Sequence, residues 1–141
     1  MPRFHLTWGT GPGVLKPFVR RVADHVAGGH VQLRFRHRVT RLIRAGIAVT
    51  GVAGEVLEPT SVVRGESSSR TVVGDFEIAA LVVIVASGGI GGDPDRVRRH
   101  WPVDRLGPAP KSMVSGVPAH VDGRMLDVAG DAGARSEEHT S

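Results

Sequence analysis

Apolar and polar residues alternate with different periods along the chain, and each period predicts one kind of element. Over 14–27, apolar residues recur every three or four positions while basic residues occupy the opposite face, which predicts an amphipathic helix. The apolar positions are Val14, Leu15, Phe18, Val19, Val22 and Val26. Gly28-Gly29 follows, and glycine at that place is typical of a helix end.

A period of two predicts the next elements. Over 31–35, apolar residues alternate with polar ones, as in a half-buried strand. A second extended piece covers 39–43, Ala45-Gly46 makes a turn, and 47–52 has the pattern of the returning strand of a hairpin. After a long polar loop, 71–78 is expected to form another strand.

The segment 81–85 differs because it is apolar on both faces and rich in β-branched residues. This pattern is typical of a strand buried in a parallel sheet between helices. Asp93 is expected to cap a short helix that reaches about residue 100, and 121–134 is expected to form a second helix. The order of elements predicts an α/β fold, a partial Rossmann-like domain with an antiparallel β-hairpin insertion.

Composition narrows the class of protein. The chain has 141 residues, 40% of them hydrophobic and 23% charged, which fits one globular domain. The absence of cysteine excludes a disulfide framework, thiol catalysis and cysteine-ligated metal sites. The longest apolar run covers only 78–86, too short to cross a bilayer, and residues 1–8 lack the pattern of a secretory signal. We therefore expect a cytoplasmic protein that does not enter a membrane.

Charge is distributed unevenly. Residues 1–45 hold nine Lys or Arg and one acid, residues 46–93 hold two and six, and residues 94–141 hold seven of each. Five of the cations form an arginine stripe over 34–44, which is either a solvated face or a surface for an acidic partner. The five are Arg34, Arg36, Arg38, Arg41 and Arg44. Nucleic acid is disfavoured because no aromatic residues interleave with the arginines to stack bases.

Two glycine clusters are candidates for ligand binding. Neither fits G-x-G-x-x-G, because Val14 and Pro94 stand where the third glycine would be. A tight turn is the alternative for each cluster, and it is favoured for the first cluster and not for the second. The second cluster, 88–92, follows the predicted parallel strand, where α/β sheets bind ligands and backbone N–H groups can meet phosphate. His120 and Asp122 form a close His/carboxylate pair, but no third ligand lies near them, so no metal site is expected.

Several short motifs follow one another in a recognisable order. They are His5-Leu6-Thr7-Trp8-Gly9-Thr10-Gly11-Pro12-Gly13, Val49-Thr50-Gly51-Val52, Ala86-Ser87-Gly88-Gly89, Asp122-Gly123-Arg124-Met125-Leu126 and Ala132-Gly133-Ala134. In this order and spacing the chain resembles the FAD-binding dehydrogenases of the fumarate reductase/succinate dehydrogenase flavoprotein superfamily, which includes 3-ketosteroid dehydrogenase-like enzymes.

The resemblance implies FAD as the cofactor and a set of residues that contact it. The cofactor-binding residues that it implies are Val39, Ala86, Ser87, Gly88, Gly89, Asp122 and Gly123. Val39 would bond the adenine through its main chain, and the glycine motif would lie beside the flavin nucleotide. Ser87 stands where the family has Thr and keeps the hydroxyl, whereas His120-Val121 replaces the first two residues of the family's T-G-D-G.

The same resemblance implies an incomplete enzyme. The family's dinucleotide fingerprint, its capping domain and its proton-transferring residues have no counterpart in the chain, so we expect no catalytic residue here. The parent protein would transfer a hydride between a carbon of a small-molecule substrate and FAD, while the isolated chain would bind FAD weakly or not at all. The alternative is a small basic binding module that uses the arginine stripe.

The last seven residues have a sequence that is unusual for a protein terminus. The string Arg135-Ser136-Glu137-Glu138-His139-Thr140-Ser141 can be encoded in frame by a widely used short-read sequencing adapter. We therefore expect 135–141 to be an artefactual tail, and 1–134 to be a partial FAD-binding domain from the interior of a longer protein.

Overall fold

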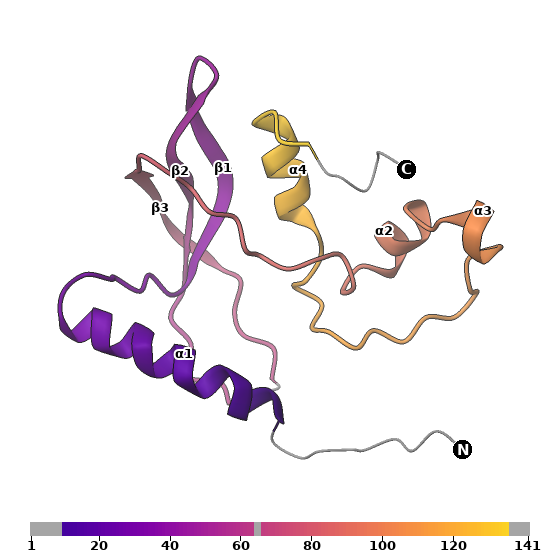
Figure 1. The fold of residues 1–141 in the computed structure, drawn as a ribbon, viewed down its shortest axis with the longest axis horizontal. Helices are drawn as coiled ribbons and strands as arrows, with labels where there is room; N and C mark the ends of the chain where they lie inside the picture. Colours follow the sequence, from indigo (N-terminus) through magenta and orange to yellow (C-terminus); the bar gives the residue numbers. More distant parts are fainter. Residues whose placement is uncertain (1–9, 64–65, 136–141) are drawn as a thin grey trace. The chain divides into compact units, whose positions relative to one another are not determined.

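The computed structural model describes residues 10–63 and 66–135. These residues belong to two compact units, an N-terminal unit within Met1–Phe35 and a C-terminal unit within Arg36–Ser141, and each is described here by itself (Figure 1). Motif residues 5–9, and all of the predicted tail except Arg135, lie outside the described residues.

The N-terminal unit consists of one helix and an extended segment. Helix α1 spans Thr10–Ala27, so the predicted helix is confirmed and begins four residues earlier than expected. It ends at Gly28-Gly29, where the N–H groups of Gly28 and His30 donate to the carbonyls of Asp24 and His25 at 3.0 and 2.9 Å. The strand predicted over 31–35 is wrong, because 31–34 is irregular. Alternation favours a strand only where a neighbouring strand supplies ladder hydrogen bonds, and no described strand pairs with this segment.

The C-terminal unit contains a three-stranded antiparallel sheet. Strands β1 (His37–Ala45), β2 (Ala48–Leu57) and β3 (Val72–Ala79) lie in the order β1-β2-β3. Ala45 pairs with Ala48 across a two-residue turn at Gly46-Ile47, so the predicted hairpin and the third strand are confirmed. Strands β1 and β2 are longer than predicted, because their pairing extends from the turn as far as His37 and Val56.

Strand β1 contains a bulge that decides which side chains share a face. Val39 pairs with Gly54 and Arg41 pairs with Ala53, so Thr40 is the extra residue. The bulge shifts the alternation by one position, and Val39 and Leu42 are both half-buried while Thr40 and Arg41 are exposed.

Glycine is required opposite this bulge. The backbone of β1 comes so close to Gly54 that an added Cβ atom would lie 2.9 Å from the Cα atom of Val39 and would collide with the carbonyl oxygen of Arg38. The close approach of the two strands therefore leaves room only for glycine at position 54.

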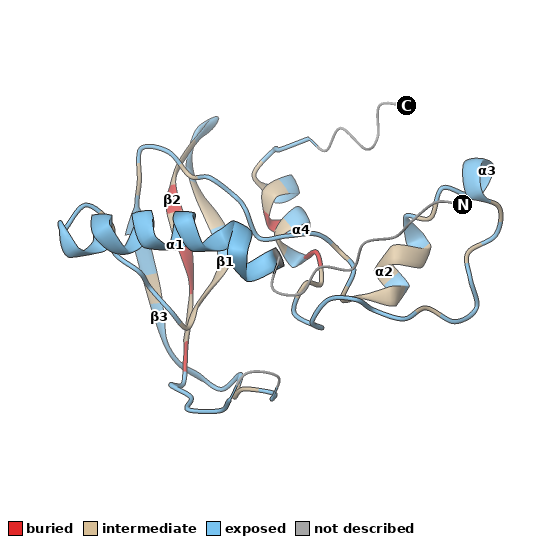
Figure 2. Ribbon diagram, turned by 60° about the horizontal axis from the view of Figure 1, so that its bottom comes forward, coloured by how far each residue is buried: buried red, intermediate tan, exposed pale blue. Residues whose placement is uncertain are grey.

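Burial is concentrated on the middle strand and on the last helix. Ala53 and Leu57 of β2 and Val128 of helix α4 (Arg124–Asp131) are the buried hydrophobic residues of the described chain, and Figure 2 shows the buried positions in red on β2 and at α4. Helix α4 lies against β1 and covers part of the sheet.

The buried strand predicted over 81–85 is wrong. The segment is irregular, and Leu81 and Ile84 are 100% and 87% exposed. A strand that is apolar on both faces needs neighbouring strands at both edges and helices on both faces, and the described residues supply neither. The sequence pattern thus indicates a buried position in a sheet, which the described residues do not provide.

Three short helices follow. Helix α2 spans Pro94–Arg99 and begins, as predicted, at Asp93, whose side chain accepts the N–H groups of Asp95 and Arg96. Helix α3 covers Val103–Leu106.

The predicted helix over 121–134 is confirmed in a shorter form, α4 at Arg124–Asp131. It begins late because Gly123 has a left-handed backbone with φ of +73°. No helix of the described residues is long and apolar enough to cross a membrane.

Candidate functional site

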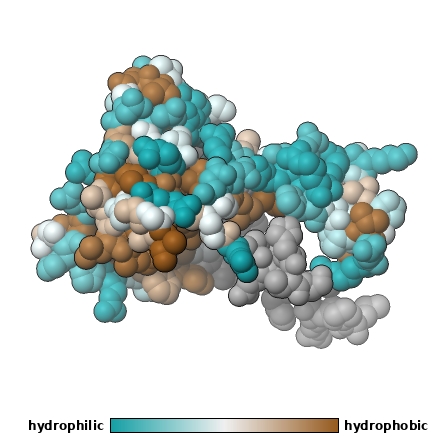
Figure 3. All heavy atoms as spheres, turned by 90° about the horizontal axis from the view of Figure 1, so that it is seen from above, coloured by the Kyte–Doolittle hydropathy of each residue, from teal (hydrophilic) through white to brown (hydrophobic). Residues whose placement is uncertain are grey.

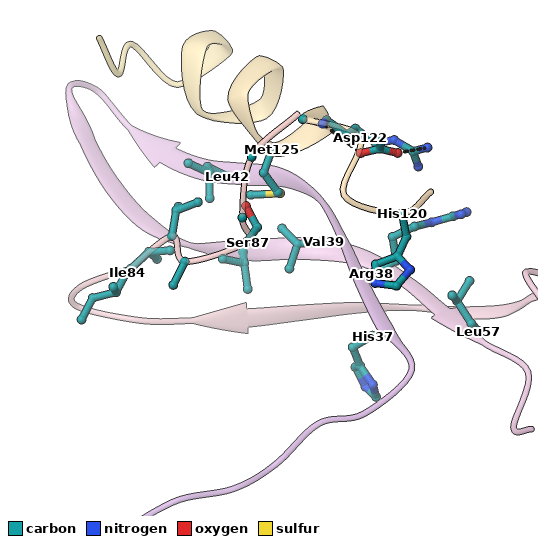
Figure 4. Close-up of a pocket in the computed structure, with 18 of the residues that line it drawn as sticks. His37, Arg38, Val39, Leu42, Leu57, Ile84, Ser87, His120, Asp122 and Met125 are labelled. Atoms are coloured by element: carbon teal, nitrogen blue, oxygen red, sulfur yellow. Dashed lines mark hydrogen bonds and ion pairs between the residues drawn. The ribbon is translucent and has the colours of Figure 1, made fainter. Parts of the chain in front are cut away.

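A hollow of about 830 Å³ lies in the C-terminal unit between the sheet, the segment 83–89 and the turn before α4 (Figure 4). All seven residues that the resemblance implied as cofactor contacts line it. They are Val39, Ala86, Ser87, Gly88, Gly89, Asp122 and Gly123. Three segments that are at least 33 positions apart in the sequence thus meet at one surface, although their role toward a cofactor stays a prediction.

The sheet supplies an apolar wall. Val39 and Leu42 share a face because of the bulge at Thr40, and Val52 pairs directly with Leu42 on that face. Figure 4 shows Ser87 and Met125 drawn on the same side of β1 as Leu42. Leu42, Val52 and Met125 were not among the predicted contacts. The hairpin register could have identified Leu42 and Val52, since they flank Val39 on one face.

Residues 86–89 of the glycine loop 86–92 form another part of the lining. An added Cβ atom at Gly88 would lie 3.4 Å from Cγ1 of Val121, and no atom of the described residues lies within 4 Å of the corresponding position at Gly89. The N–H of Gly92 donates to the carbonyl of Val121 at 2.7 Å, and the hydroxyl of Ser115 donates to the carbonyl of Gly91 at 2.8 Å. The loop is therefore tied to the turn before α4 while its tip stays open to a ligand.

Asp122 lies two residues before helix α4. Its carboxylate accepts the backbone N–H of Arg124 at 3.0 Å and pairs with the Arg124 guanidinium at 3.1 Å. This half-buried carboxylate thus has a local structural partner on each oxygen.

Two residues of the arginine stripe lie at the rim and are engaged within the unit. Arg36 has φ of +60°, donates to the carbonyl of Glu58 at 2.8 Å and to the hydroxyl of Ser68 at 3.1 Å, and also bonds the carbonyl of Ser69. Arg36 therefore holds both ends of the loop that joins β2 to β3.

Arg38 is the second of these residues. Its guanidinium donates two hydrogen bonds to one carboxylate oxygen of Glu55, at 2.8 and 2.5 Å. The stripe is thus divided, because Arg41 and Arg44 remain exposed on the same strand.

Arg96 forms the densest set of polar contacts beside the hollow. Its guanidinium donates to both carboxylate oxygens of Asp127, at 3.0 and 2.5 Å, and to the carbonyl of Gly123 at 3.1 Å. The hydrogen bond from Arg96 lowers the pKa of Asp127, and the same bond raises the pKa of Arg96. The backbone N–H of Arg96 is the main cause that lowers the pKa of Asp93. Nothing in the sequence indicated this pairing.

Comparison with known proteins identifies relatives of the chain. It is 55% identical over 134 residues to a KsdD-like steroid dehydrogenase of Mycolicibacterium smegmatis, covering 95% of this chain and 24% of that protein. The identity is also 55% over 134 residues to a KsdD-like steroid dehydrogenase of Mycobacterium tuberculosis, of which the chain covers 23%. The chain therefore spans about a quarter of the length of these curated relatives.

The comparison with protein families gives a match over almost the whole chain, whereas no solved structure gives a significant match. Residues 1–140 match the family described as FAD binding domain. This chain therefore belongs to the FAD binding domain family.

Proposed function

We propose that the chain is one part of the FAD-binding domain of an FAD-dependent dehydrogenase, and that the hollow contacts the cofactor. The observation that carries the proposal is the convergence of the apolar wall of β1 and β2 with the glycine loop and the Asp122-Gly123 turn. Membership in the FAD binding domain family supports FAD as the ligand.

The residues around the hollow suit a flavin nucleotide. An aromatic ring system can lie against the apolar side chains of Val39, Leu42 and Met125. The loop at Ser87-Gly88-Gly89 presents backbone with no bulky side chain on its tip, so a ligand can approach its N–H groups closely. When bound, FAD supplies a hydride acceptor or donor. The chain's own residues would orient that cofactor, and the proton-transferring groups would come from elsewhere in the enzyme.

The names of the relatives support a substrate class. Both are KsdD-like steroid dehydrogenases, so a steroid is the substrate that we propose for the intact protein. The alternative of a basic binding module is not favoured, because Arg36 and Arg38 bind groups within their own unit.

A chimera tests the proposal. The matching segment of the Mycolicibacterium smegmatis relative is replaced by residues 1–134 of this chain, and FAD is measured after gel filtration. We expect one yellow, stoichiometric complex from the chimera and no retained FAD from the 141-residue chain alone. A folded but colourless chimera would refute the proposed cofactor role, and a stoichiometric complex of the isolated chain would refute its dependence on further segments.

Two matched substitutions locate the site. Gly89 lines the hollow and Gly116 does not, yet at both positions no atom of the described residues lies within 4 Å of an added Cβ. We expect Gly89→Phe to weaken FAD binding by the chimera at least about tenfold, because the ring occupies the hollow. Gly116→Phe is the control and should leave the Kd unchanged. Equal Kd values for the two variants would place the cofactor elsewhere.

A further inference from the structure

We propose that Arg96 is a positioning residue for the cofactor site, because it holds the two loops of the hollow at a fixed separation. This inference rests on the proposed function. Arg96 lies on α2, directly after the glycine loop, and it reaches α4 directly after the Asp122-Gly123 turn.

The contacts of Arg96 run from Asp93, the residue after the glycine loop, to Gly123 and Asp127. On the α2 side, its backbone N–H donates to Oδ1 of Asp93 at 2.9 Å, and its Nε lies 4.0 Å from Oδ2 of the same residue. On the α4 side, Nη1 donates to the carbonyl of Gly123 at 3.1 Å, and the fork of Nη1 and Nη2 binds both oxygens of Asp127. The side chain is 17% exposed, so most of it lies between the two segments.

Packing between the same segments leaves little room for a shift. An added Cβ atom at Gly123 would lie 2.5 Å from Cγ2 of Ile90 and 2.9 Å from Cδ of Arg96. The hydrogen bond from the backbone N–H of Gly92 to the carbonyl of Val121 joins the same two segments. The Gly123 carbonyl that Arg96 binds is therefore part of the wall that faces the glycine loop.

Arginine suits this role in a way that lysine does not. The guanidinium is planar and presents its donors in a fixed fork, so one side chain can hold a carboxylate and a carbonyl at once. An ammonium group keeps the charge but concentrates its donors at one point, so Arg96→Lys would keep attraction to Asp127 without fixing Gly123.

Arg98 provides a matched control on the same helix. It also forms an i,i+3 ion pair, with Asp95 at 2.8 Å, and it donates to the carbonyl of Lys111 at 3.1 Å. Like Arg96, it does not line the hollow, but among the described residues it forms no hydrogen bond with Gly123 or Asp127. Arg98→Lys thus makes the same chemical change on α2 at a position that does not connect α2 to α4.

The first measurement is amide hydrogen exchange of the 141-residue chain at submicromolar concentration. The Gly92 amide reports on the connection, because it donates to the carbonyl of Val121. We expect Arg96→Lys to speed exchange at the Gly92 amide about tenfold, and Arg98→Lys to leave it unchanged. An unprotected Gly92 amide in the unsubstituted chain, or equal rates in both variants, would overturn the inference.

The second measurement is the Kd for FAD of the chimera carrying each variant. The melting temperatures of the FAD-free variants are measured as well, so that a change in Kd can be separated from a change in stability. We expect Arg96→Lys to raise the Kd about tenfold and to alter the visible absorption of the bound flavin, and Arg98→Lys to do neither. A purely structural role would change the melting temperature but not the Kd of the folded protein, so an unchanged Kd overturns the inference. If the unsubstituted chimera retains no FAD, the proposed function fails and the exchange experiment alone decides the role of Arg96.

Discussion

Close packing requires glycine at two positions of the C-terminal unit. Gly123 is buried, has φ of +73°, and lies where a side chain would meet Ile90 and Arg96. Gly54 is in a similar situation opposite the bulge at Thr40. Neither requirement follows from hydrophobic patterning, because each depends on a partner far away in the sequence.

Replacing Gly123 tests this steric requirement. We expect Gly123→Ala to lower the free energy of unfolding by about 1–3 kcal/mol, since Ala is strained at positive φ and its methyl group would contact Ile90. Urea unfolding followed by circular dichroism measures the change. Gly130 is a matched control inside α4, with open space around it among the described residues. Gly130→Ala should raise stability by up to about 1 kcal/mol. Equal effects of the two changes would contradict the steric interpretation.

The residues of the site were predictable only through the resemblance. It implied Val39, Ser87 and Asp122 as cofactor contacts, which stays a prediction, and these three residues line one hollow that the sequence pattern alone could not indicate. Arg96 was not predicted, because its partners Gly123 and Asp127 are 27 and 31 positions away and no local signal marks such a pair.

At the scale of elements, the predictions that depend only on residues close together in the sequence were confirmed. Helix α1 follows from its own periodicity, the start of α2 from the Asp93 cap, and the β1–β2 hairpin from its turn. The predicted strands at 31–35 and 81–85 fail because a strand exists only with a neighbour, and the described chain pairs neither segment. Apolar alternation therefore predicts the environment of a strand but does not supply its partner.

Acid should loosen the connection between α2 and α4. The pKa values of Asp93 and Asp127 are lowered by hydrogen bonds from Arg96, so both carboxylates favour the folded state when ionised. Their folded-state pKa lies below the unfolded value, so their contribution is present above the ordinary aspartate pKa of about 3.9 and is lost as pH falls through the lowered values.

Amide exchange of α2 and α4 between pH 6 and pH 2 would follow this loss, after correction for the intrinsic pH dependence of exchange. Asp127→Asn should weaken the connection at pH 6 and reduce its dependence on pH. Asp93→Asn should keep the cap, because asparagine is also a good N-cap residue, and should remove only the pH dependence at α2. Protection of both helices that does not change between pH 6 and pH 2 in the unsubstituted chain would contradict this assignment.

At the scale of the whole molecule, much apolar surface is uncovered. The apolar side chains of α1 are exposed, and Leu81, Val82 and Ile84 are 100%, 74% and 87% exposed. Apolar residues, drawn in brown, are visible on the face shown in Figure 3. Since the relatives are about four times as long as the matched segment, we propose that other parts of the intact protein cover these surfaces.

Self-association of the isolated chain is the expected result of this exposure. Light scattering and binding of a hydrophobic dye should both increase with concentration for the 141-residue chain. The double variant Val82→Lys/Ile84→Lys should reduce self-association while leaving the sheet intact, because both side chains lie on the surface. The matched control is Arg41→Lys/Arg44→Lys, which conserves charge on exposed positions of β1. A monodisperse monomer at high micromolar concentration would contradict the expectation.

The sequential order β1-β2-β3 has a consequence for how the chain acquires its structure. Each strand pairs with its nearest neighbour in the sequence, and the first pair closes over only Gly46-Ile47. Contacts of short sequence separation form fastest, since they require the least loop closure. We therefore expect the sheet to form first. Ser87 and Asp122 are 35 positions apart, so they should come together only after the sheet that lines the hollow has formed.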